Sequence, residues 1–432
     1  MGKRVAVIGA GPAGAITAIA LKRQGFEPTL YDKVTVVEDV LAAIKRDESV
    51  SVAFSQDGGG FSISGNGVKV IKHLGLWDYF AENHNDPILE LNLMLFDGSD
   101  RITRNTHKAE KEQSIHIMRG KLQTVLMKAA HDMGINVYGG KKLQSVTQTT
   151  EDVTLEFVDG TVAVVDFVVG ADGINSKVRR LVFPEVPSAV VRGTGYATVC
   201  DVVNPDGTDI GFFNHHAGIY SDPLNHRFIF TSRVGKTEGD VKIYLLDKSQ
   251  PLEGGDDWRP VTDLPKEAEK LGDLLQSWGA VPGVVEGIRR AKRINPVNLY
   301  DLADMPTFYK GRVVLVGDAA HGTVPLYGQG LNQALEDGGV LGDLMGHFQD
   351  TEYTKAFEVY DQIRIPRTRM TSAVARQTMS RMMVSSYPQQ VIARFMMRTV
   401  INIKEFLGKD DEVLFHDFRD DVRAAVPGIQ LK

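Results

Sequence analysis

The chain has 432 residues, 43% hydrophobic and 24% charged, so it can bury a large core and has the composition of an ordinary globular protein. Its formal net charge of -6 provides no general attraction to nucleic acid or to an anionic membrane. A single cysteine, Cys200, excludes an intramolecular disulfide and a cysteine-based metal cluster.

The N-terminal segment predicts a protein without a secretion signal. Lys3 and Arg4 lead straight into an apolar strand and a glycine-rich turn, which leaves no room for a separate signal peptide. There is no run of 18 apolar residues, so we expect no integral membrane association. A lone cysteine fits a reducing compartment, and we therefore expect a cytoplasmic protein.

The first 31 residues have the pattern of a strand, a helix and a second strand. Val5–Ile8 is apolar throughout, as in a buried parallel strand, and Pro12–Gln24 has its apolar residues at helical spacing. Gly25 is expected to end the helix, and Pro28–Tyr31 to form the second strand. This is the unit on which nucleotide-binding α/β sheets are built.

The turn after the first strand carries glycines at positions 9, 11 and 14, in the spacing G-x-G-x-x-G. Gly9 permits a tight turn, Gly11 lets a pyrophosphate approach the backbone, and Gly14 lets helix and strand pack closely. Asp32 ends the second strand, where an acidic residue binds ribose hydroxyls. The pattern predicts dinucleotide binding but does not choose between FAD and NAD.

Further along the chain, a region of alternating helices and strands is followed by a region of strands alone. The first region predicts helices at Glu38–Lys45, Gly67–Leu74 and Lys121–Met133. It predicts strands at Asn136–Tyr138, Thr147–Val158, Thr161–Ala163 and Phe167–Gly170. Alternating strands of a separate antiparallel sheet follow at Gly195–Val202, Gly211–Phe213, Ala217–Ser221, Arg227–Val234 and Val241–Leu245. Helix returns at Lys266–Ile288, a buried strand at Val313–Val316, and mostly helix from Asn332 onward.

This order predicts an α/β protein in which a Rossmann-like dinucleotide-binding domain is interrupted by an inserted antiparallel β-sheet domain. We assign residues 1–75, 100–185 and 290–345 to the cofactor domain. Residues 76–99 and 186–289 form the substrate-binding sheet domain in this interpretation, and residues 346–432 a C-terminal helical region.

Two more strand–Gly–Asp turns favour FAD over NAD. Asp172 follows the apolar residues FVVG, and Asp318 follows VVLVG. Both are expected at carboxyl ends of parallel strands, the edge at which such sheets bind ligands. A fold that binds only NAD does not need two additional turns of this kind so far along the chain.

The three turns together resemble the class A flavoprotein monooxygenases, the p-hydroxybenzoate-hydroxylase-like group, over roughly residues 3–345. The resemblance implies an enzyme that binds FAD and takes electrons from NADPH or NADH. It implies that dioxygen, activated as a flavin C4a-hydroperoxide, hydroxylates or epoxidises an electron-rich aromatic or polycyclic small molecule. A monomer and a homodimer are both compatible with the sequence.

The resemblance also implies which residues bind the cofactor. They are Gly9, Gly11, Ala13, Gly14, Asp32, Lys33, Arg46, Arg119, Asp172, Gly317, Asp318, Pro325, Gly328, Gly330, Leu331 and Asn332. Arg119 would lie near the pyrophosphate, and Asp318 near the pyrophosphate or the ribityl chain. Residues 328–332 would place backbone amides against the flavin pyrimidine edge, and Pro325 would lie close to the ring. Asp172 and Arg179 would bridge the cofactor domain and the nicotinamide donor, or Asp172 would only cap a turn.

Some positions depart from the family pattern. The segment between Asp32 and Gly58 is long, so Arg46 matches the family's cofactor-contacting arginine only loosely. Cys200 stands where some members carry an arginine that faces the flavin, which removes the most recognisable proton donor. No other catalytic acid or base, and no metal site, is predicted.

Histidines and methionines receive mostly structural interpretations. Among the adjacent His215 and His216 one could face a substrate, but a surface or core position is favoured, and His321 is expected to form a structural hydrogen bond. The methionine-rich helices between Met345 and Met397 are expected to pack a core or to roof the substrate pocket.

Three other functions remain open from the sequence. A flavin-dependent halogenase shares the fold, but its W-x-W-x-I-P segment is missing and Trp77, Trp258 and Trp278 are isolated. A reductase or dehydrogenase of the same superfamily would transfer electrons without inserting oxygen. A non-catalytic binding protein could keep the dinucleotide fold, although the glycine-rich loop at 328–332 speaks against it.

Overall fold

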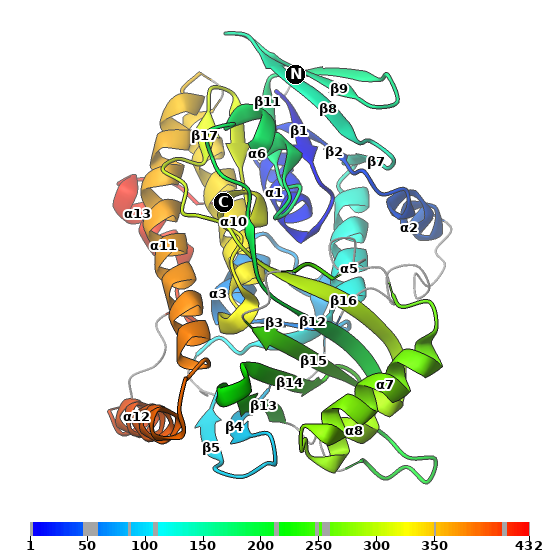
Figure 1. The fold of residues 1–432 in the computed structure, drawn as a ribbon. Helices are drawn as coiled ribbons and strands as arrows, with labels where there is room; N and C mark the ends of the chain where they lie inside the picture. The colour runs from blue at the N-terminus through cyan, green and yellow to red at the C-terminus, as the bar shows by residue number, and fades with distance from the viewer. Residues whose placement is uncertain are drawn as a thin grey trace.

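The structure is a computed structural model that describes residues 3–45, 59–84, 88–106, 111–210, 216–246, 250–252, 260–349, 351–407 and 413–431. Arg46, His215 and the strand expected at residues 211–213 lie outside these ranges. The described chain forms two large sheets and two small ones with helices around them, and the long helix α11 (Tyr353–Arg381) runs beside both large sheets (Figure 1).

The first sheet has six strands in the order β17-β18-β11-β1-β2-β7, and all pairs except β17–β18 are parallel. Its strands are β1 (Arg4–Ile8), β2 (Glu27–Tyr31), β7 (Asn136–Tyr138), β11 (Phe167–Gly170), β17 (Tyr309–Lys310) and β18 (Val313–Leu315). The parallel strands therefore end at one common edge.

Helices pack closely against the first sheet. The principal ones are α1 (Pro12–Arg23), α5 (Arg119–Asp132) and α10 (Gly330–Phe348). A Cβ at Gly338 of α10 would lie 2.8 Å from Ile16 Cγ2, and one at Gly342 would lie 2.7 Å from Ala20 Cβ. These glycines let α10 pack closely against α1, and the N-terminal ends of both helices lie at the same edge of the sheet.

The second sheet has seven strands in the order β16-β12-β15-β14-β13-β4-β5. They are β4 (Glu90–Leu95), β5 (Ile102–Asn105), β12 (Val190–Asp201), β13 (His216–Asp222), β14 (Arg227–Arg233), β15 (Glu238–Leu246) and β16 (Ala291–Asp301). The predicted insertion of a β-sheet module is confirmed, with one difference: β13 pairs with β4 in parallel. This pairing is parallel because β4 enters the sheet from a separate segment and not through a hairpin.

Strand pairing also bears on the division into domains. Residues 102–105 and 291–301 were assigned to the cofactor domain, but they form strands β5 and β16 of the second sheet. The division remains a proposal, and its boundaries are better drawn with these strands in the sheet domain.

Two helices cover one face of the second sheet. The helix expected at Lys266–Ile288 is divided into α7 (Leu264–Ser277) and α8 (Pro282–Arg289). The break falls at Gly279, which has φ +77°, and at Pro282, which starts the new helix. Buried apolar side chains of both helices pack with strand residues of this face. The opposite face of the sheet is turned toward the cofactor domain.

The remaining elements are shorter, and some of their strands form two small sheets, of three and of two strands. They are α2 (Val36–Lys45), β3 (Gly60–Ile63), α3 (Gly65–His73), α4 (Trp77–Ala81), β6 (Ile115–Met118), β8 (Leu143–Gln148), β9 (Val153–Phe157), β10 (Val162–Val165), α6 (Lys177–Val182), α9 (Asp318–His321) and the 3₁₀ turns η1 (Pro223–Asn225) and η2 (Pro325–Tyr327). The strand expected at Thr147–Val158 is two strands, β8 and β9, joined by a tight turn.

The C-terminal region is helical, as predicted. After α11 come α12 (Tyr387–Phe406) and α13 (Phe418–Ala425). In the described part of the chain no helix combines the length and apolarity that a membrane crossing requires.

Candidate active site

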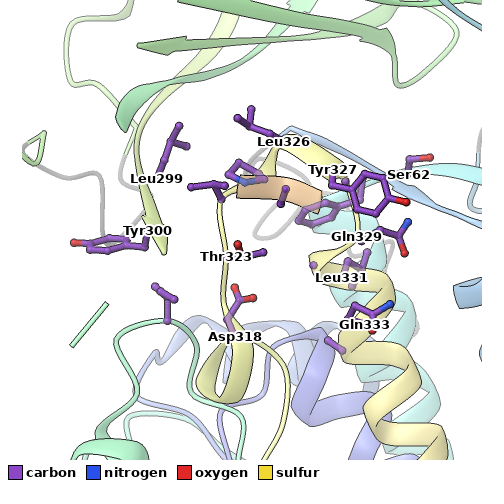
Figure 2. Close-up of a pocket in the computed structure, with 18 of the residues that line it drawn as sticks. Ser62, Leu299, Tyr300, Asp318, Thr323, Leu326, Tyr327, Gln329, Leu331 and Gln333 are labelled. Atoms are coloured by element: carbon purple, nitrogen blue, oxygen red, sulfur yellow. The ribbon is translucent and has the colours of Figure 1, made fainter. Parts of the chain in front are cut away.

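A cavity of about 1920 Å³ lies between the two sheets. Pockets for small molecules usually measure about 300–1,000 Å³, so this one has room for a large cofactor and a second molecule. It extends from the glycine turn after β1, past the start of α10, to the inner face of the second sheet and to methionines of the C-terminal helices. Figure 2 shows the part of the cavity near α10, with Asp318, Leu331 and Leu299 around it.

The three glycine-containing turns meet at one end of this cavity. Gly9 has φ +105°, and a Cβ there would lie 2.4 Å from the carbonyl oxygen of Ala171. Gly317 has φ +59°, and a Cβ there would lie 2.9 Å from Ala13 Cβ. Both positions accept only glycine, because a side chain would be strained and would collide. The predicted convergence of the turns is confirmed.

Gly11 and Gly14 have different surroundings. A Cβ at Gly14 would lie 1.9 Å from the carbonyl oxygen of Gly9, whereas a Cβ at Gly11 would meet nothing within 4 Å. Gly11 lines the cavity and is the N-cap of α1, where no side chain binds the free amides. Gly14 thus serves the packing of helix on strand, and Gly11 keeps open a space in front of the positive end of the helix, where a pyrophosphate is stabilised.

Two substitutions should separate these roles. We expect Gly14→Val to prevent stable folding, because its side chain would overlap the Gly9 backbone. Gly11→Val should leave thermal unfolding of the apoprotein nearly unchanged and yet weaken FAD binding, because its side chain occupies the open space. Circular dichroism melting and FAD titration check both results. Equal effects of the two substitutions on folding would contradict this assignment.

Asp32 lies on the cavity wall at the end of β2. Its Oδ2 accepts a hydrogen bond from the Ala10 amide at 2.7 Å, and its Oδ1 accepts one from the Val34 amide at 2.9 Å. A carboxylate has about four acceptor sites, so ribose hydroxyls can bind to the remaining ones. Lys33, which is exposed, lies at the rim beside it.

Asp172 caps the start of α6. Its Oδ1 accepts from the Ser176 hydroxyl, and its Oδ2 accepts from the Lys177 and Val178 amides at 2.6 and 3.1 Å. Burial raises the pKa of this carboxyl group, although these hydrogen bonds oppose the rise. The contacts favour the turn-capping interpretation, while the residue still lines the cavity.

Arg179 does not line the cavity but ties two of the turns together. It is buried, and its guanidinium donates to the carbonyl oxygens of Ile174, at 2.5 Å, and Ala319, at 2.7 Å. These carbonyls belong to the segments that follow Asp172 and Asp318. Arg179 therefore links the backbone of these two segments, and its contact with the nicotinamide donor stays a prediction.

Asp318 begins α9 and directs its carboxyl group into the cavity (Figure 2). Although the group is open to the cavity, it lies deep in the protein, and this desolvation raises its pKa against the opposing charges of His321 and Arg119. A Cβ at Gly330 would lie 3.9 Å from Asp318 Oδ1, so the carboxyl group faces the start of α10. His321 forms the predicted structural hydrogen bond, 2.7 Å from Asp337 Oδ2.

The loop before α10 presents backbone to the cavity. Gly328 has φ +66° and open space at its Cβ position, and no side chain caps the start of α10. Asn332 points away from the cavity: its Oδ1 accepts from the Ser64 amide at 2.9 Å, and its Nδ2 donates to the Gly328 carbonyl at 3.1 Å. Its side chain therefore shapes the loop, and only its backbone amide remains for a ligand.

Most of the predicted cofactor residues line the cavity. Those that do are Gly9, Gly11, Ala13, Asp32, Lys33, Arg119, Asp172, Asp318, Pro325, Gly328, Gly330 and Leu331. Gly14, Gly317 and Asn332 lie behind this wall, where they support its backbone. Cys200 lies on the far face of the second sheet, where burial raises the pKa of its thiol, so it takes no part in the site.

A polar cluster at the end of the cavity next to the second sheet, buried except for Lys242, was missed by sequence reasoning. It comprises His116 on β6, Ser232 on β14, and Asp240 and Lys242 on β15. His116 Nε2 lies 3.1 Å from Ser232 Oγ, and Lys242 Nζ lies 2.6 Å from Asp240 Oδ2. Burial, with the charge of Lys242, lowers the pKa of His116 to about 3, so this imidazole is neutral at physiological pH. No motif marks these residues, because three separate segments contribute them.

Comparison with known proteins gives one family, over most of the chain. A family model described as an FAD binding domain matches residues 3–210 and 289–399. The chain is 28% identical to the 3-amino-4-hydroxybenzoate 2-monooxygenase of Streptomyces platensis, over 93% of this chain and 94% of the relative. It is 26% identical to the 6-hydroxynicotinate 3-monooxygenase of Pseudomonas fluorescens, over 84% of this chain and 88% of the relative.

Solved structures share the fold. A salicylate hydroxylase substrate complex superimposes with a TM-score of 0.72 at 22% identity, covering 99% of both chains. Klebsiella pneumoniae HpxO, complexed with FAD and uric acid, gives a TM-score of 0.74 at 21% identity, covering 95% of this chain and 97% of the other.

Proposed function

Because the chain belongs to the family of FAD-dependent aromatic monooxygenases, we propose that it uses NAD(P)H and dioxygen to hydroxylate an electron-rich aromatic small molecule in the cavity between its two sheets. The observation that carries the proposal is the meeting of the turns at Gly9, Asp172 and Asp318 at one end of that cavity. An elongated dinucleotide is the kind of ligand that contacts all three turns at once.

The residues at this end fit FAD. The free amides at the start of α1 hold the pyrophosphate, Asp32 accepts from the adenosine ribose, and Asp318 with Arg119 flanks the pyrophosphate and ribityl region. The free amides at the start of α10 face the pyrimidine edge, where a helix N-terminus stabilises the negative charge of a reduced flavin. When bound, FAD supplies the electron transfer from NAD(P)H and the activation of dioxygen.

The far part of the cavity is suited to hold an apolar ring and to exclude water. The sheet face there is mostly apolar, and Met382, Met396 and Met397 of the C-terminal region line the cavity from the other side. An apolar enclosure protects reactive oxygen chemistry from stray protons and water. The protein thus contributes position and dryness, which explains why no side-chain triad is needed.

The substrate class rests on the relatives. The names of two of them specify hydroxylated aromatic acids, a hydroxybenzoate and a hydroxynicotinate. We propose a substrate of similar chemistry, a hydroxylated or amino-substituted aromatic ring. The aromatic ring of such a compound is electron-rich and open to an electrophilic oxygen.

The proposal predicts a coloured protein with a substrate-stimulated oxidase activity. Purified protein should show flavin absorption, and aromatic compounds should increase NADPH or NADH consumption. With ¹⁸O-labelled dioxygen, one label should appear in the product. A protein that cannot be reconstituted with FAD contradicts the proposal, and reduction or oxidation of substrate without label incorporation assigns it to the reductases instead.

A further inference from the structure

The part of the cavity next to the second sheet, proposed to hold the substrate, has one cationic side chain near the centre of that sheet, Lys242. The sheet residues that line it are mostly apolar: Leu91, Leu93, Ala217, Ile219, Phe228, Phe230, Val297 and Leu299. Lys242 lies among them on β15, a central strand, while the other lining cation of this sheet, Arg104, lies on the outermost strand β5. An ammonium group in such a position loses hydration and needs partners.

Two partners fix the ammonium group of Lys242. Its Nζ lies 2.6 Å from Asp240 Oδ2 and donates to the carbonyl oxygen of Gly60 at 2.8 Å. The Gly60 amide in turn donates to Asp240 Oδ2 at 3.1 Å, so one residue of β3 bridges the pair with its N–H and its carbonyl. An ammonium has three donors, and within the described residues these contacts use two.

The surroundings of Asp240 indicate that the pair is built to hold Lys242 in place. Asp240 is fully buried, and its Oδ1 has no hydrogen-bond partner among the described residues. A Cβ at Gly59 would lie 2.2 Å from that oxygen, so the backbone of the cofactor side closes tightly over the carboxylate. Lys242, in contrast, lines the cavity. The carboxylate is thus enclosed, and the ammonium is the member of the pair that a ligand can reach.

The Lys242–Asp240 pair is connected to the cofactor end of the cavity through strand β3. Two residues beyond Gly60 on β3, the carbonyl of Ser62 accepts from Asn332 Nδ2 at 3.3 Å. Asn332 belongs to the loop whose amides face the proposed flavin pyrimidine edge. A ligand group on Lys242 is therefore anchored to the same strand that holds this loop.

We propose that Lys242 anchors an ionised oxygen of the substrate, a carboxylate or a phenolate attached to the aromatic ring. This rests on the proposed function and specifies its substrate class as anionic. The third N–H of the ammonium donates to the oxygen in a charge-assisted hydrogen bond, which is strong in an apolar cavity. The ring then lies against the apolar sheet residues, with Phe230 next to the anchor, its centroid 5.1 Å from Lys242 Nζ.

The test is ligand binding to the holoenzyme, followed by the change in flavin absorbance. The probes are benzoate, 4-hydroxybenzoate and 4-hydroxybenzamide, which carry the carboxylate alone, both groups, and the phenol alone. In Lys242→Met the affinity for an anchored oxyanion should fall roughly 10- to 100-fold. Loss for the two acids identifies a carboxylate; loss for the amide, with binding that strengthens as its phenol ionises, identifies a phenolate.

Two further variants keep the result interpretable. Lys292→Met is the matched control, because Lys292 lies on β16 of the same sheet, pairs with Asp201 at 2.6 Å and Glu238 at 3.2 Å, and does not line the cavity. It should bind all probes like the wild type. If Lys242→Met folds poorly because Asp240 is left without its counterion, the double variant Asp240→Asn/Lys242→Met removes both charges and should show the same loss.

Unchanged affinities in both Lys242 variants, or no binding of any probe to the wild type, overturn the anchor. A neutral aromatic compound that nevertheless stimulates NADPH oxidation leaves the monooxygenase proposal intact. Failure of FAD reconstitution, in contrast, removes the proposed function itself.

Discussion

Replacing Arg364 by methionine is expected to lower the free energy of unfolding by about 3–5 kcal/mol, the range for removing one partner of a buried ion pair. Arg364 lies on α11, and its Nε is 2.7 Å from Asp337 Oδ1 and its Nη1 is 2.6 Å from Glu336 Oε2. All three side chains are 0% exposed. Methionine fills similar space but leaves two buried carboxylates with too little positive charge.

Urea unfolding of the apoprotein measures this effect without a contribution from the cofactor. Arg423→Met is the control, because Arg423 is 55% exposed and its only described ion pair, with Asp420 at 3.2 Å, should contribute less than about 0.5 kcal/mol. A loss below about 1 kcal/mol in Arg364→Met would show that the carboxylates find other partners or are protonated.

Acid should act on the same cluster. The charges of Arg364 and Arg367 lower the pKa of Glu336 to about 2 against the opposing effect of burial, compared with about 4.3 in an unfolded chain. A lowered folded-state pKa stabilises the protein fully above the unfolded pKa, and this stabilisation disappears as the pH falls toward 2. Because Arg364→Met removes a charge that lowers this pKa, the difference in unfolding free energy between wild type and variant should shrink as the pH falls from about 4.3 toward 2, which urea unfolding at a series of pH values measures.

The second large effect is expected at the cofactor. Asp318→Ala should weaken FAD binding by roughly 10- to 100-fold, the value of one hydrogen bond to a charged group. The carboxyl group faces the cavity beside the start of α10, and its raised pKa makes proton uptake easier, which reduces repulsion by a nearby phosphate. Titration of apoprotein with FAD, followed by quenching of flavin fluorescence, gives the dissociation constant.

Asp318→Asn keeps an oxygen acceptor of the same shape and should retain most of the affinity. Asp206→Ala, in an exposed turn of the sheet domain, should bind FAD like the wild type. If alanine at position 318 leaves the dissociation constant unchanged, Asp318 does not contact the cofactor.

The cofactor end of the cavity was predictable because its signals are local. Each of its turns is a short sequence pattern, an apolar strand followed by glycine and, in two of the three, aspartate. Parallel strands bring such turns to one edge without further information. Even the capping contacts of Asp172 could be anticipated from a serine four residues later and a helix start.

The substrate end was not predictable in the same way. Lys242 and His116 are separated by more than a hundred residues and meet only because β6 and β15 both contact the β3 region. Nothing near either residue in the sequence distinguishes it from a surface lysine or an ordinary core histidine. The membership of β5 and β16 in the second sheet was missed for the same reason, since strand pairing between distant segments leaves no local mark.

The charged cluster of α10 was predictable from the sequence only in part. Two adjacent acids, Glu336 and Asp337, stand next to the apolar, glycine-rich segment GGVLG of their helix, which signals buried charge. The sequence does not reveal which of the many arginines neutralise them. Packing of α11 against α10 makes that choice.

The strand order of the second sheet has a consequence for synthesis on the ribosome. The twelve-residue strand β12 (Val190–Asp201) pairs on one side with β15 and on the other with β16. Until residues 291–301 emerge, one whole edge of β12 has no partner, and an unpaired edge of this length invites pairing with other chains. During this interval the nascent protein carries an edge that is prone to pair with other chains, and the pairing that completes the sheet joins distant segments and therefore forms slowly.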